Sequence, residues 1–293
     1  MVMKKGIGIR ILESPLWFLL PYFLLFCVFK LGPIIANFVV SGYDLDIVGE
    51  GTFVGLKNYA TLLKDRLFWV ALKNTLYYLG LVGPVNVIGG LFLALLLNHH
   101  IRGRTIARTA VFMPYVIMVT VVGVLWRWIL ESRHGILNYY LGFFGIEPVP
   151  WLTSPSTAMI GIFIASVWWT IGYNTVIFLA GLQDVPRELV EAAQIDGASP
   201  LRKLISVILP CLRPTTFFVV LTTIIYSLQV FGQVYTMTGG GPRYATLTVV
   251  QYLYIAGFRL FRLGYSATIS AVLFAVILAM SLGVLRFLKQ TVD

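Results

Sequence analysis

The chain has 293 residues, of which 58% are hydrophobic and 12% are charged. Soluble globular proteins carry about 25% charged residues, so this composition excludes that class. The formal charge of +10 comes from basic residues that lie between long apolar runs. A nucleic-acid-binding protein would gather such residues in one folded patch, so the distribution argues against nucleic acid as a partner.

Six apolar segments are each long enough to cross a membrane, because about 20 apolar residues in a helix span the hydrocarbon core. They are residues 16–40, 76–97, 109–130, 158–182, 215–237 and 265–288. Backbone polar groups inside a bilayer must be hydrogen-bonded within the chain, so these segments are predicted to be α-helices. The predicted fold class is an all-α membrane protein with six transmembrane helices, in which residues 1–15 precede one transmembrane domain, 16–293.

The first apolar segment follows basic residues, as in a signal peptide, but it is too long and no small-residue cleavage site follows it. It is therefore interpreted as an uncleaved helix. Lys30 is the only lysine within an apolar segment. A charge inside a membrane is costly, and two interpretations stay open: Lys30 lines an aqueous cavity, or its long stem carries the charge to the interface.

The positions of Lys and Arg predict the orientation, because cytoplasmic segments carry an excess of these residues. With the N-terminus inside, the cytoplasmic segments hold twelve basic residues and the outer segments hold eight, although the outer segments are longer. Six spans place both termini on the same side. The prediction is a multi-pass membrane protein with a cytoplasmic N-terminus, residues 1–15, and a cytoplasmic C-terminus.

The motifs of several catalytic and nucleotide-binding sites are absent from the sequence. None of the eight lysines precedes Ser or Thr, so there is no P-loop, and neither His-Glu-x-x-His nor Gly-x-Ser-x-Gly occurs. Cys27 and Cys211 have no metal-binding spacing. No acidic residue lies inside a predicted span, which argues against a proton-coupled carrier and against a membrane-embedded enzyme. The glycines 239–241 are predicted to form a turn.

The predicted cytoplasmic segment 183–214 holds four acidic and four basic residues in a helical rather than a turn-like sequence. Asp184 is predicted to cap a first helix, since its carboxylate can accept hydrogen bonds from the first free N–H groups. Gly197 is predicted to end that helix. A second helix is predicted to start with Ser199 as its cap and Pro200 in its first turn, and to end at Pro210.

Three short stretches in this segment resemble a known motif: Glu191-Ala192-Ala193, Asp196-Gly197-Ala198 and Leu209-Pro210. Together they are similar to the EAA motif of permease subunits in binding-protein-dependent ABC importers, although Leu204 stands where the family usually has Phe. Further stretches resemble the branch related to the maltose and glycerol-phosphate permeases: Phe53-Val54-Gly55-Leu56-Lys57-Asn58-Tyr59, Asn74-Thr75 and Thr238-Gly239-Gly240-Gly241-Pro242.

The resemblance implies a type I ABC importer permease core whose cytoplasmic loop, 183–214, forms a coupling helix docked on an ATPase. The residues that it implies for coupling are Glu191, Ala192, Ala193, Asp196 and Gly197. It further implies a bacterial or archaeal plasma membrane, a second permease subunit, two ATP-binding subunits, an extracytoplasmic substrate-binding protein and a sugar or polyol substrate. ATP and Mg would be bound by the partner ATPases, so no cofactor and no enzyme activity are expected of this chain.

Two polar and aromatic stripes are candidates for the substrate path. In the fourth predicted span the stripe follows helical spacing and comprises Ser166, Trp169, Thr170 and Tyr173. In the fifth span it comprises Thr222, Thr223, Tyr226, Ser227, Gln229 and Gln233. Hydroxyl, amide and aromatic groups together suit a polyhydroxylated ligand. The other interpretation is that these side chains join helices by hydrogen bonds inside the bundle.

The main hypothesis is therefore a permease subunit of an ABC sugar importer. A self-contained secondary carrier for a small polar solute is the alternative, but it would need an ion-coupling site. A membrane-embedded enzyme would need a reactive set of side chains. The sequence shows neither feature.

Overall fold

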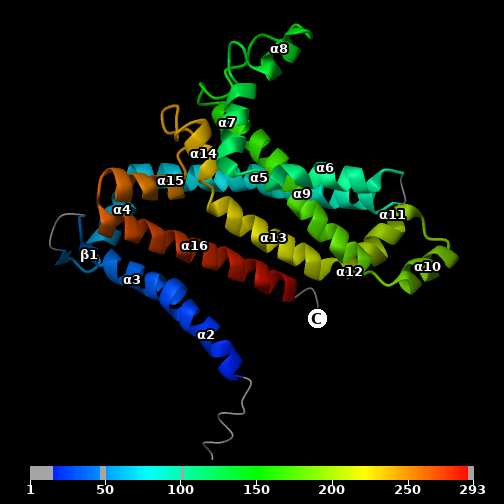
Figure 1. Cartoon of the computed structure of the whole chain (residues 1–293), viewed down its shortest axis with the longest axis horizontal. Helices are drawn as coiled ribbons and strands as arrows, with labels where there is room; N and C mark the ends of the chain where they lie inside the picture. The colour runs from blue at the N-terminus through cyan, green and yellow to red at the C-terminus, as the bar shows by residue number, and fades with distance from the viewer. Residues whose placement is uncertain (1–15, 47–50, 100–101, 290–293) are drawn as a thin grey trace, which may run out of the picture. The chain divides into compact units, whose positions relative to one another are not determined.

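The computed structural model describes residues 16–46, 51–99 and 102–289. Within these ranges the helices are α2 (Leu16–Phe26), α3 (Gly32–Ser41), α4 (Lys57–Lys64), α5 (Arg66–Asn98), α6 (Arg104–Val116), α7 (Val119–Ile129), α8 (Ile136–Gly142), α9 (Ala158–Gln183), α10 (Arg187–Ile195), α11 (Pro200–Lys203), α12 (Leu209–Cys211), α13 (Arg213–Leu228), α14 (Gly232–Met237), α15 (Val249–Tyr254) and α16 (Leu263–Lys289) (Figure 1). Three π-helical segments are η1 (Cys27–Leu31), η2 (Leu204–Ile208) and η3 (Ile255–Arg259). Strands β1 (Tyr43–Asp44) and β2 (Thr52–Phe53) pair antiparallel.

Five helices in the described part of the chain are long and apolar enough to cross a membrane. They are Trp17–Ser41, Arg66–Asn98, Ala158–Gln183, Arg213–Met237 and Leu263–Arg286. They confirm that five of the predicted apolar spans are helices. The second starts earlier than predicted, at Arg66, because the Asp65 carboxylate accepts a hydrogen bond from the Leu67 N–H at 2.8 Å and caps the helix.

The remaining predicted span, 109–130, is not one continuous helix; it corresponds to a pair of helices, α6 and α7, that together pass as a sixth, bent candidate span. α6 and α7 are separate helices bent by 99° relative to each other, with Ile117 and Met118 in extended conformation between them. Pro114 lies in the last turn of α6. A proline lacks the N–H donor and its ring crowds the carbonyl of the preceding turn, which favours the end of a helix there.

The predicted span 215–237 is one of the five candidate spans, but it contains a short break. α13 ends at Leu228 and α14 starts at Gly232, with Val230 and Phe231 outside both helices. The two interruptions lie next to each other, since a Cβ added at Gly232 would meet the side chain of Val119 at 2.8 Å. α7 and α14 are in close contact, and a Cβ at Gly123 would lie only 1.8 Å from Thr236 Oγ1.

The chain divides into two compact units, and the larger one comprises residues 65–255 and 273–293. In this unit α5 packs against α9 and α13, and α6 packs along α9. The approach of α6 to α9 needs a glycine, because a Cβ at Gly172 would lie 2.0 Å from the Val111 carbonyl oxygen. Phe178, Ala94, Leu212 and Val219 form one of the buried clusters that join these helices.

The smaller unit comprises residues up to Lys64 together with Ala256–Val272. In this unit the Ser41 carbonyl joins three segments of the chain, because it accepts hydrogen bonds from Asn58 Nδ2 at 3.0 Å and from Thr268 Oγ1 at 3.2 Å. Asn58 Nδ2 also donates to the Tyr43 carbonyl at 2.8 Å. Lys30 lies in η1 and is exposed. Its predicted roles, in a cavity or at the interface, stay predictions.

The sequence stretch Asn74-Thr75 joins α5 to the segment that follows residues 238–242. Asn74 Nδ2 donates to the carbonyls of Tyr244 at 2.8 Å and Leu247 at 3.0 Å, and Thr75 Oγ1 accepts from the Val249 N–H at 3.0 Å. The glycines form the predicted turn, with positive φ angles at Gly239 and Gly240. These residues fasten the loop after α14 to the start of α5.

Candidate functional site

A cavity of about 300 Å³, here called the central cavity, lies in the larger unit beside both helix interruptions. Its walls come from α5, α6, α7, α9, α13 and the segment that leads into α14. The lining residues are Tyr78, Val82, Asn86, Tyr115, Val119, Trp169, Thr170, Tyr173, Asn174, Thr223, Tyr226, Ser227, Gln229, Val230, Phe231, Gly232 and Gln233. Polar backbone at such interruptions is tolerated inside a membrane where it borders a cavity.

Eight of the ten residues in the two predicted stripes line this cavity. They are Trp169, Thr170, Tyr173, Thr223, Tyr226, Ser227, Gln229 and Gln233. Ser166 is outside the lining: it is fully buried in α9, and its carbonyl accepts the hydroxyl of Thr170 at 2.7 Å. Thr222 is also outside the lining, and its hydroxyl donates to the carbonyl of Phe218 at 2.8 Å.

Three aromatic rings form one wall of the central cavity. Tyr115 stacks on Tyr173, with ring centroids 4.7 Å apart and planes inclined by 24°, and on Trp169 at 5.7 Å and 30°. The indole Nε1–H of Trp169 donates to the Ile117 carbonyl at 3.0 Å. This carbonyl lies at the bend between α6 and α7, so Trp169 both lines the cavity and stabilises the bend.

Side-chain amides form a second wall. Asn86 Nδ2 donates to Thr170 Oγ1 at 2.8 Å, and Asn174 Nδ2 donates to Thr223 Oγ1 at 3.2 Å and to the Asn86 carbonyl at 3.3 Å. These bonds link α5, α9 and α13. Asn86 Oδ1 is buried and has no hydrogen-bond partner among the described residues. Both interpretations of the stripes therefore apply: Thr170 and Thr223 line the cavity and also join helices.

Sequence reasoning missed several lining residues, notably Tyr78, Asn86, Tyr115 and Asn174. The signal for the two asparagines was present, because an amide inside an apolar span is unusual and requires a partner. Tyr115 follows Pro114 directly, but only the bend between α6 and α7 brings its ring against α9. Tyr226, 61% exposed, and the exposed Gln229 mark the open side of the cavity.

The residues proposed for coupling lie on and just after α10. Glu191, Ala192, Asp196 and Gly197 are exposed, and Ala193 is half-buried. Gly197 has φ +73°, and the N–H of Ala198 bonds to the Ala193 carbonyl at 2.9 Å while the N–H of Gly197 bonds to Gln194 at 3.1 Å. This pair of bonds is a Schellman motif, which ends α10 as predicted.

The predicted cap of this helix was wrong. Asp184 lies at the C-terminal end of α9, where its N–H bonds to the Gly181 carbonyl, and α10 starts after Pro186 without a side-chain cap. α9 continues to Gln183, one residue beyond the predicted span, with Asp184 as its C-cap, and Pro186 then separates the helices. The second helical run was predicted correctly at its start, since Ser199 Oγ accepts the Arg202 N–H at 3.3 Å.

This second run continues to Cys211 and contains η2 just before Pro210. Proline cannot donate to a carbonyl in the preceding turn and crowds it, and a π-helical turn accommodates the missing bond. α10 also carries exposed apolar side chains, Leu189 at 49% and Ile195 at 86%. Figure 1 shows α10 and α11 at the end of this unit where α9 finishes, extended away from the bundle.

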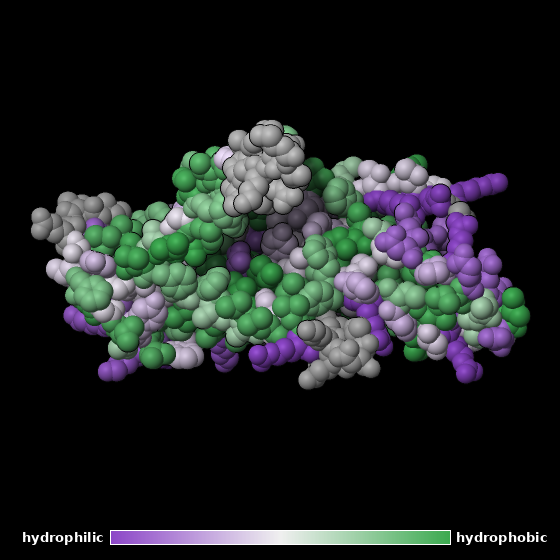
Figure 2. All heavy atoms as spheres, turned by 90° about the horizontal axis from the view of Figure 1, so that it is seen from below, coloured by the Kyte–Doolittle hydropathy of each residue, from purple (hydrophilic) through white to green (hydrophobic). Residues whose placement is uncertain are grey.

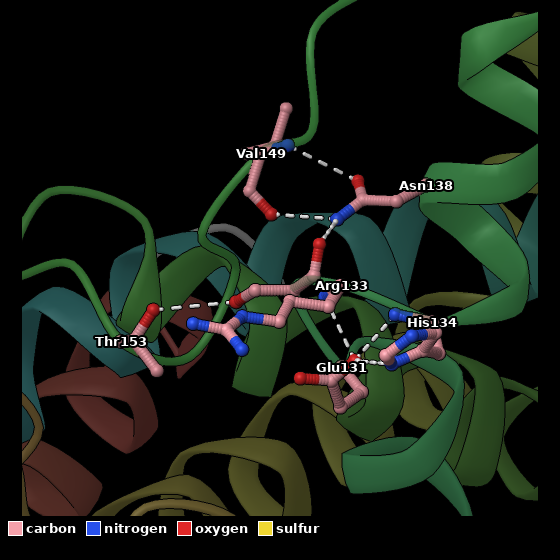
Figure 3. A network of polar contacts seen from close by, with 7 residues as sticks. Glu131, Arg133, His134, Asn138, Val149 and Thr153 are labelled. Carbon is pink, nitrogen blue, oxygen red and sulfur yellow. Dashed lines mark hydrogen bonds and ion pairs between the residues drawn. The ribbon is translucent and has the colours of Figure 1, made fainter.

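The segment between α7 and α9 lies at the other end of α9 and is well ordered by side-chain bonds (Figure 3). Asn138 Nδ2 donates to the carbonyls of Ser132 at 3.0 Å and Val149 at 2.9 Å. Its Oδ1 accepts the Val149 N–H and the Trp151 Nε1–H. The buried Asn138 thus closes a loop of the chain around itself and holds α8 in place.

Glu131 orders the first turn of this segment. Its Oε2 accepts the backbone N–H of His134 at 2.5 Å and of Arg133 at 2.7 Å (Figure 3). Hydrogen bonds that favour the carboxylate lower its pKa, and the bond from His134 makes the largest contribution. The exposed apolar side chains beyond this turn are Tyr139, Tyr140, Phe143, Phe144 and Ile146.

A bundle of membrane-spanning helices with interrupted helices around an internal cavity defines the class of membrane transport proteins. Comparison with known proteins gives the family. The family model described as "Binding-protein-dependent transport system inner membrane component" matches residues 86–292. The chain belongs to this family, so it is a permease subunit of an ABC importer, as the EAA-like motif predicted.

Curated relatives match over nearly the whole chain. The trehalose/maltose transport system permease protein MalF of Thermococcus litoralis is 34% identical over 92% of this chain and 91% of its own length. The sn-glycerol-3-phosphate transport system permease protein UgpA of Yersinia enterocolitica is 33% identical, covering 95% of both chains. The arabinooligosaccharides transport system permease protein AraP of Bacillus subtilis is 38% identical over 92% of this chain and 86% of its own.

A solved structure has the same fold. The crystal structure of a bacterial ABC transporter that imports the acidic polysaccharide alginate matches with a TM-score of 0.83 and 23% identity, covering 94% of this chain and 95% of the other. The predicted fold class, an all-helical type I importer permease, is confirmed, and the alternative of a self-contained carrier is not favoured.

Proposed function

We propose that this permease subunit transports a sugar or a related polyol through the central cavity. The observation that carries the proposal is the composition of the cavity wall: stacked rings of Tyr115, Tyr173 and Trp169 face a set of amides and hydroxyls. A pyranose ring has apolar faces that pack on aromatic rings and hydroxyl groups that need hydrogen-bond partners. The names of the three curated relatives, which transport sugars or glycerol phosphate, support this class of substrate.

Tyr226→Ala tests this proposal. Tyr226 is exposed on the open side of the cavity, and its removal is expected to reduce substrate uptake by about tenfold, the loss that accompanies about 1.4 kcal/mol of binding free energy. The measurement is uptake of a panel of labelled sugars by the reconstituted importer. Phe218→Ala is the control, because Phe218 is an exposed ring of the same helix outside the cavity lining. Equal losses in both variants would reject the cavity as the path.

The sugar that reaches this cavity is proposed to come from an extracytoplasmic binding protein. One solved alginate transporter with the same fold was determined in complex with its periplasmic protein loaded with an alginate pentasaccharide. The aromatic surface of α8 and the following residues, defined by Tyr139, Tyr140, Phe143 and Phe144, is exposed and lies on a loop ordered by Asn138. A rigid aromatic surface is typical of a protein interface.

The opposite end of α9 is proposed to couple transport to ATP hydrolysis. α10 extends beyond the bundle, and its exposed Glu191, Ala192, Leu189 and Ile195 offer a surface for the ATPase. ATP and Mg belong to those partner subunits. Two ATPases and a second, different permease subunit complete the proposed importer, with both termini of this chain in the cytoplasm.

Ala193→Asp tests the coupling proposal. Ala193 is half-buried in the last turn of α10, and a charge there would alter the surface that α10 offers to the ATPase. The expected result is loss of substrate-stimulated ATP hydrolysis in a complex that still assembles. Ser156→Asp, with the same added charge on an exposed residue before α9, should hydrolyse ATP normally. Normal stimulation in the Ala193 variant would show that α10 is a solvated linker.

A further inference from the structure

A second cavity of about 740 Å³ lies where α5 and α9 end and where α6 and α10 begin. It is called the arginine cavity here, because Arg104, Arg108 and Arg187 line it. Glu191 is the acidic residue in the lining, and His99 is the remaining ionisable residue. Three guanidinium groups against one carboxylate leave the cavity positively charged. It is separate from the central cavity and shares no lining residue with it.

Arg108 is held in a fixed position in this wall. Its Nη2 donates to the Leu97 carbonyl at 2.9 Å, at the end of α5. Its Nε is buried and has no hydrogen-bond partner among the described residues. A buried guanidinium N–H without an acceptor is costly, so an anion that reaches this side of Arg108 would gain a charge-assisted hydrogen bond.

The start of α10 adds a second source of positive potential. Arg187 and Val185 line the cavity, and α10 begins after Pro186 with no side chain capping its first N–H groups. The first N–H groups of a helix point outward and attract anions, an effect that adds to the helix dipole. The cavity therefore combines guanidinium groups with free backbone donors.

The position of the cavity relative to the membrane indicates the kind of anion. α5 and α9 are both membrane-spanning by length and composition, and their last residues, Asn98 and Gln183, line the cavity. On the right-hand side of Figure 2, where α10 and α11 of the larger unit lie, hydrophilic residues gather beside apolar ones. The cavity thus lies at the ends of two candidate membrane spans, and the ends of such spans are where the phosphates of phospholipid headgroups are found.

We propose that the arginine cavity is a binding site for a phosphate-bearing anion at the membrane boundary. The phosphate belongs either to the headgroup of an anionic phospholipid or to a free phosphate ion, and the guanidinium forks of Arg104 and Arg187 are the main contacts. Because Glu191 and the start of α10 line the same cavity, the bound anion would hold the coupling segment against the ends of α5 and α9. The site does not depend on the identity of the transported substrate.

The test measures lipid binding to the assembled importer in phosphatidylcholine nanodiscs. Phosphatidylglycerol is titrated in, and bound lipids are counted by native mass spectrometry. We expect one saturable phosphatidylglycerol site that Arg104→Gln and Arg187→Gln each weaken by about fivefold, the effect of one basic residue near an anionic surface. Arg102→Gln is the matched control, because Arg102 is exposed and outside the lining. Arg108 is left unchanged, since its bond to Leu97 also supports the fold.

A second arm identifies the source of the phosphate. Inorganic phosphate is added at increasing concentration. If it displaces phosphatidylglycerol with the same dependence on the arginines, the site also binds phosphate ions. If inorganic phosphate does not compete, the site is specific for lipid headgroups. Binding of phosphatidylglycerol no tighter than phosphatidylcholine, or an equal loss in the Arg102 variant, would overturn the proposal. An assembled importer that binds neither anion would also overturn it, and would leave the arginines as contacts for the ATPase.

Discussion

Several side chains of the central cavity both line the cavity and hold neighbouring helices together. Trp169 lines the central cavity and donates to the Ile117 carbonyl at the bend of the broken span. Thr170 and Asn174 line the same cavity and join α9 to α5 and α13. Substitution of these residues would alter both packing and ligand contact. Tyr226 is exposed, so its substitution tests ligand contact with less effect on helix packing.

Glu131 gives a pH-dependent prediction at the scale of one residue. Its pKa is lowered in the folded chain by hydrogen bonds from His134 and Arg133. A group with a lowered folded-state pKa stabilises its surroundings above its unfolded pKa, and this contribution is lost as the pH falls through the folded value. Acidification should therefore loosen the turn at residues 131–135, with faster amide hydrogen exchange after correction for the intrinsic rate.

In the Glu131→Gln variant, the backbone amides of residues 131–135 should exchange faster at neutral pH. The variant should also lose most of the response to acid, because a neutral amide side chain cannot change its charge with pH. Glu147→Gln is the control, an exposed carboxylate of the same outer segment. An unchanged acid response in the Glu131 variant would assign the effect to another group.

At the scale of elements, close helix contacts depend on a few glycines. A Cβ at Gly123 would lie 1.8 Å from Thr236 Oγ1, so Gly123→Ala should force α7 and α14 apart. Overpacking of this kind costs about 1–3 kcal/mol, and the midpoint of thermal unfolding in detergent should fall. Gly80→Ala is the matched control, because nothing lies within 4 Å of a Cβ there and alanine favours the helix. A similar loss in both variants would contradict the close contact.

Gly197 provides a second prediction at this scale. Its φ of +73° is unfavourable for alanine by about 1–2 kcal/mol, whereas asparagine tolerates it better, and no atom lies within 4 Å of an added Cβ. Gly197→Ala should therefore reduce substrate-stimulated ATP hydrolysis of the reconstituted importer through backbone strain alone, and Gly197→Asn should retain more of it. If the two variants behave alike, the left-handed turn after α10 has no part in coupling.

Apolar runs were enough to predict five spanning helices, because length and hydropathy decide whether a helix crosses a membrane. They could not predict the interruptions at 117–118 and 229–231. Pro114 precedes the first, but Pro84 lies within the unbroken helix α5, and no proline lies in 229–231. Only packing against neighbouring elements determines whether a helix breaks at such a position or continues through it. For the same reason the sequence identified eight lining residues in two predicted spans but missed Tyr115 and Asn86, which the bend and a third helix bring to the cavity.

At the scale of the whole molecule, the orientation in the membrane remains a prediction from charge. After Cys27 and Cys211 are replaced, Ser156→Cys should react with a membrane-impermeant maleimide in intact cells, and Gln194→Cys only in inverted vesicles. Both positions are exposed, and they lie before and after the 26-residue helix α9. Labelling of Gln194→Cys from outside would reverse the orientation and place α10 away from any cytoplasmic ATPase.

The hydrogen bond between Trp169 and the bend also bears on the thermodynamics of transport. The aromatic wall is assembled from α6 and α9, which pack along each other and are joined by this bond and by stacking. A wall that is already ordered loses little conformational entropy when a ligand arrives, so binding there is preorganised. The side that carries Tyr226 and Gln229 is exposed and less constrained. A cycle that alternately binds and releases its cargo would then vary its affinity by moving α13 against a fixed aromatic face.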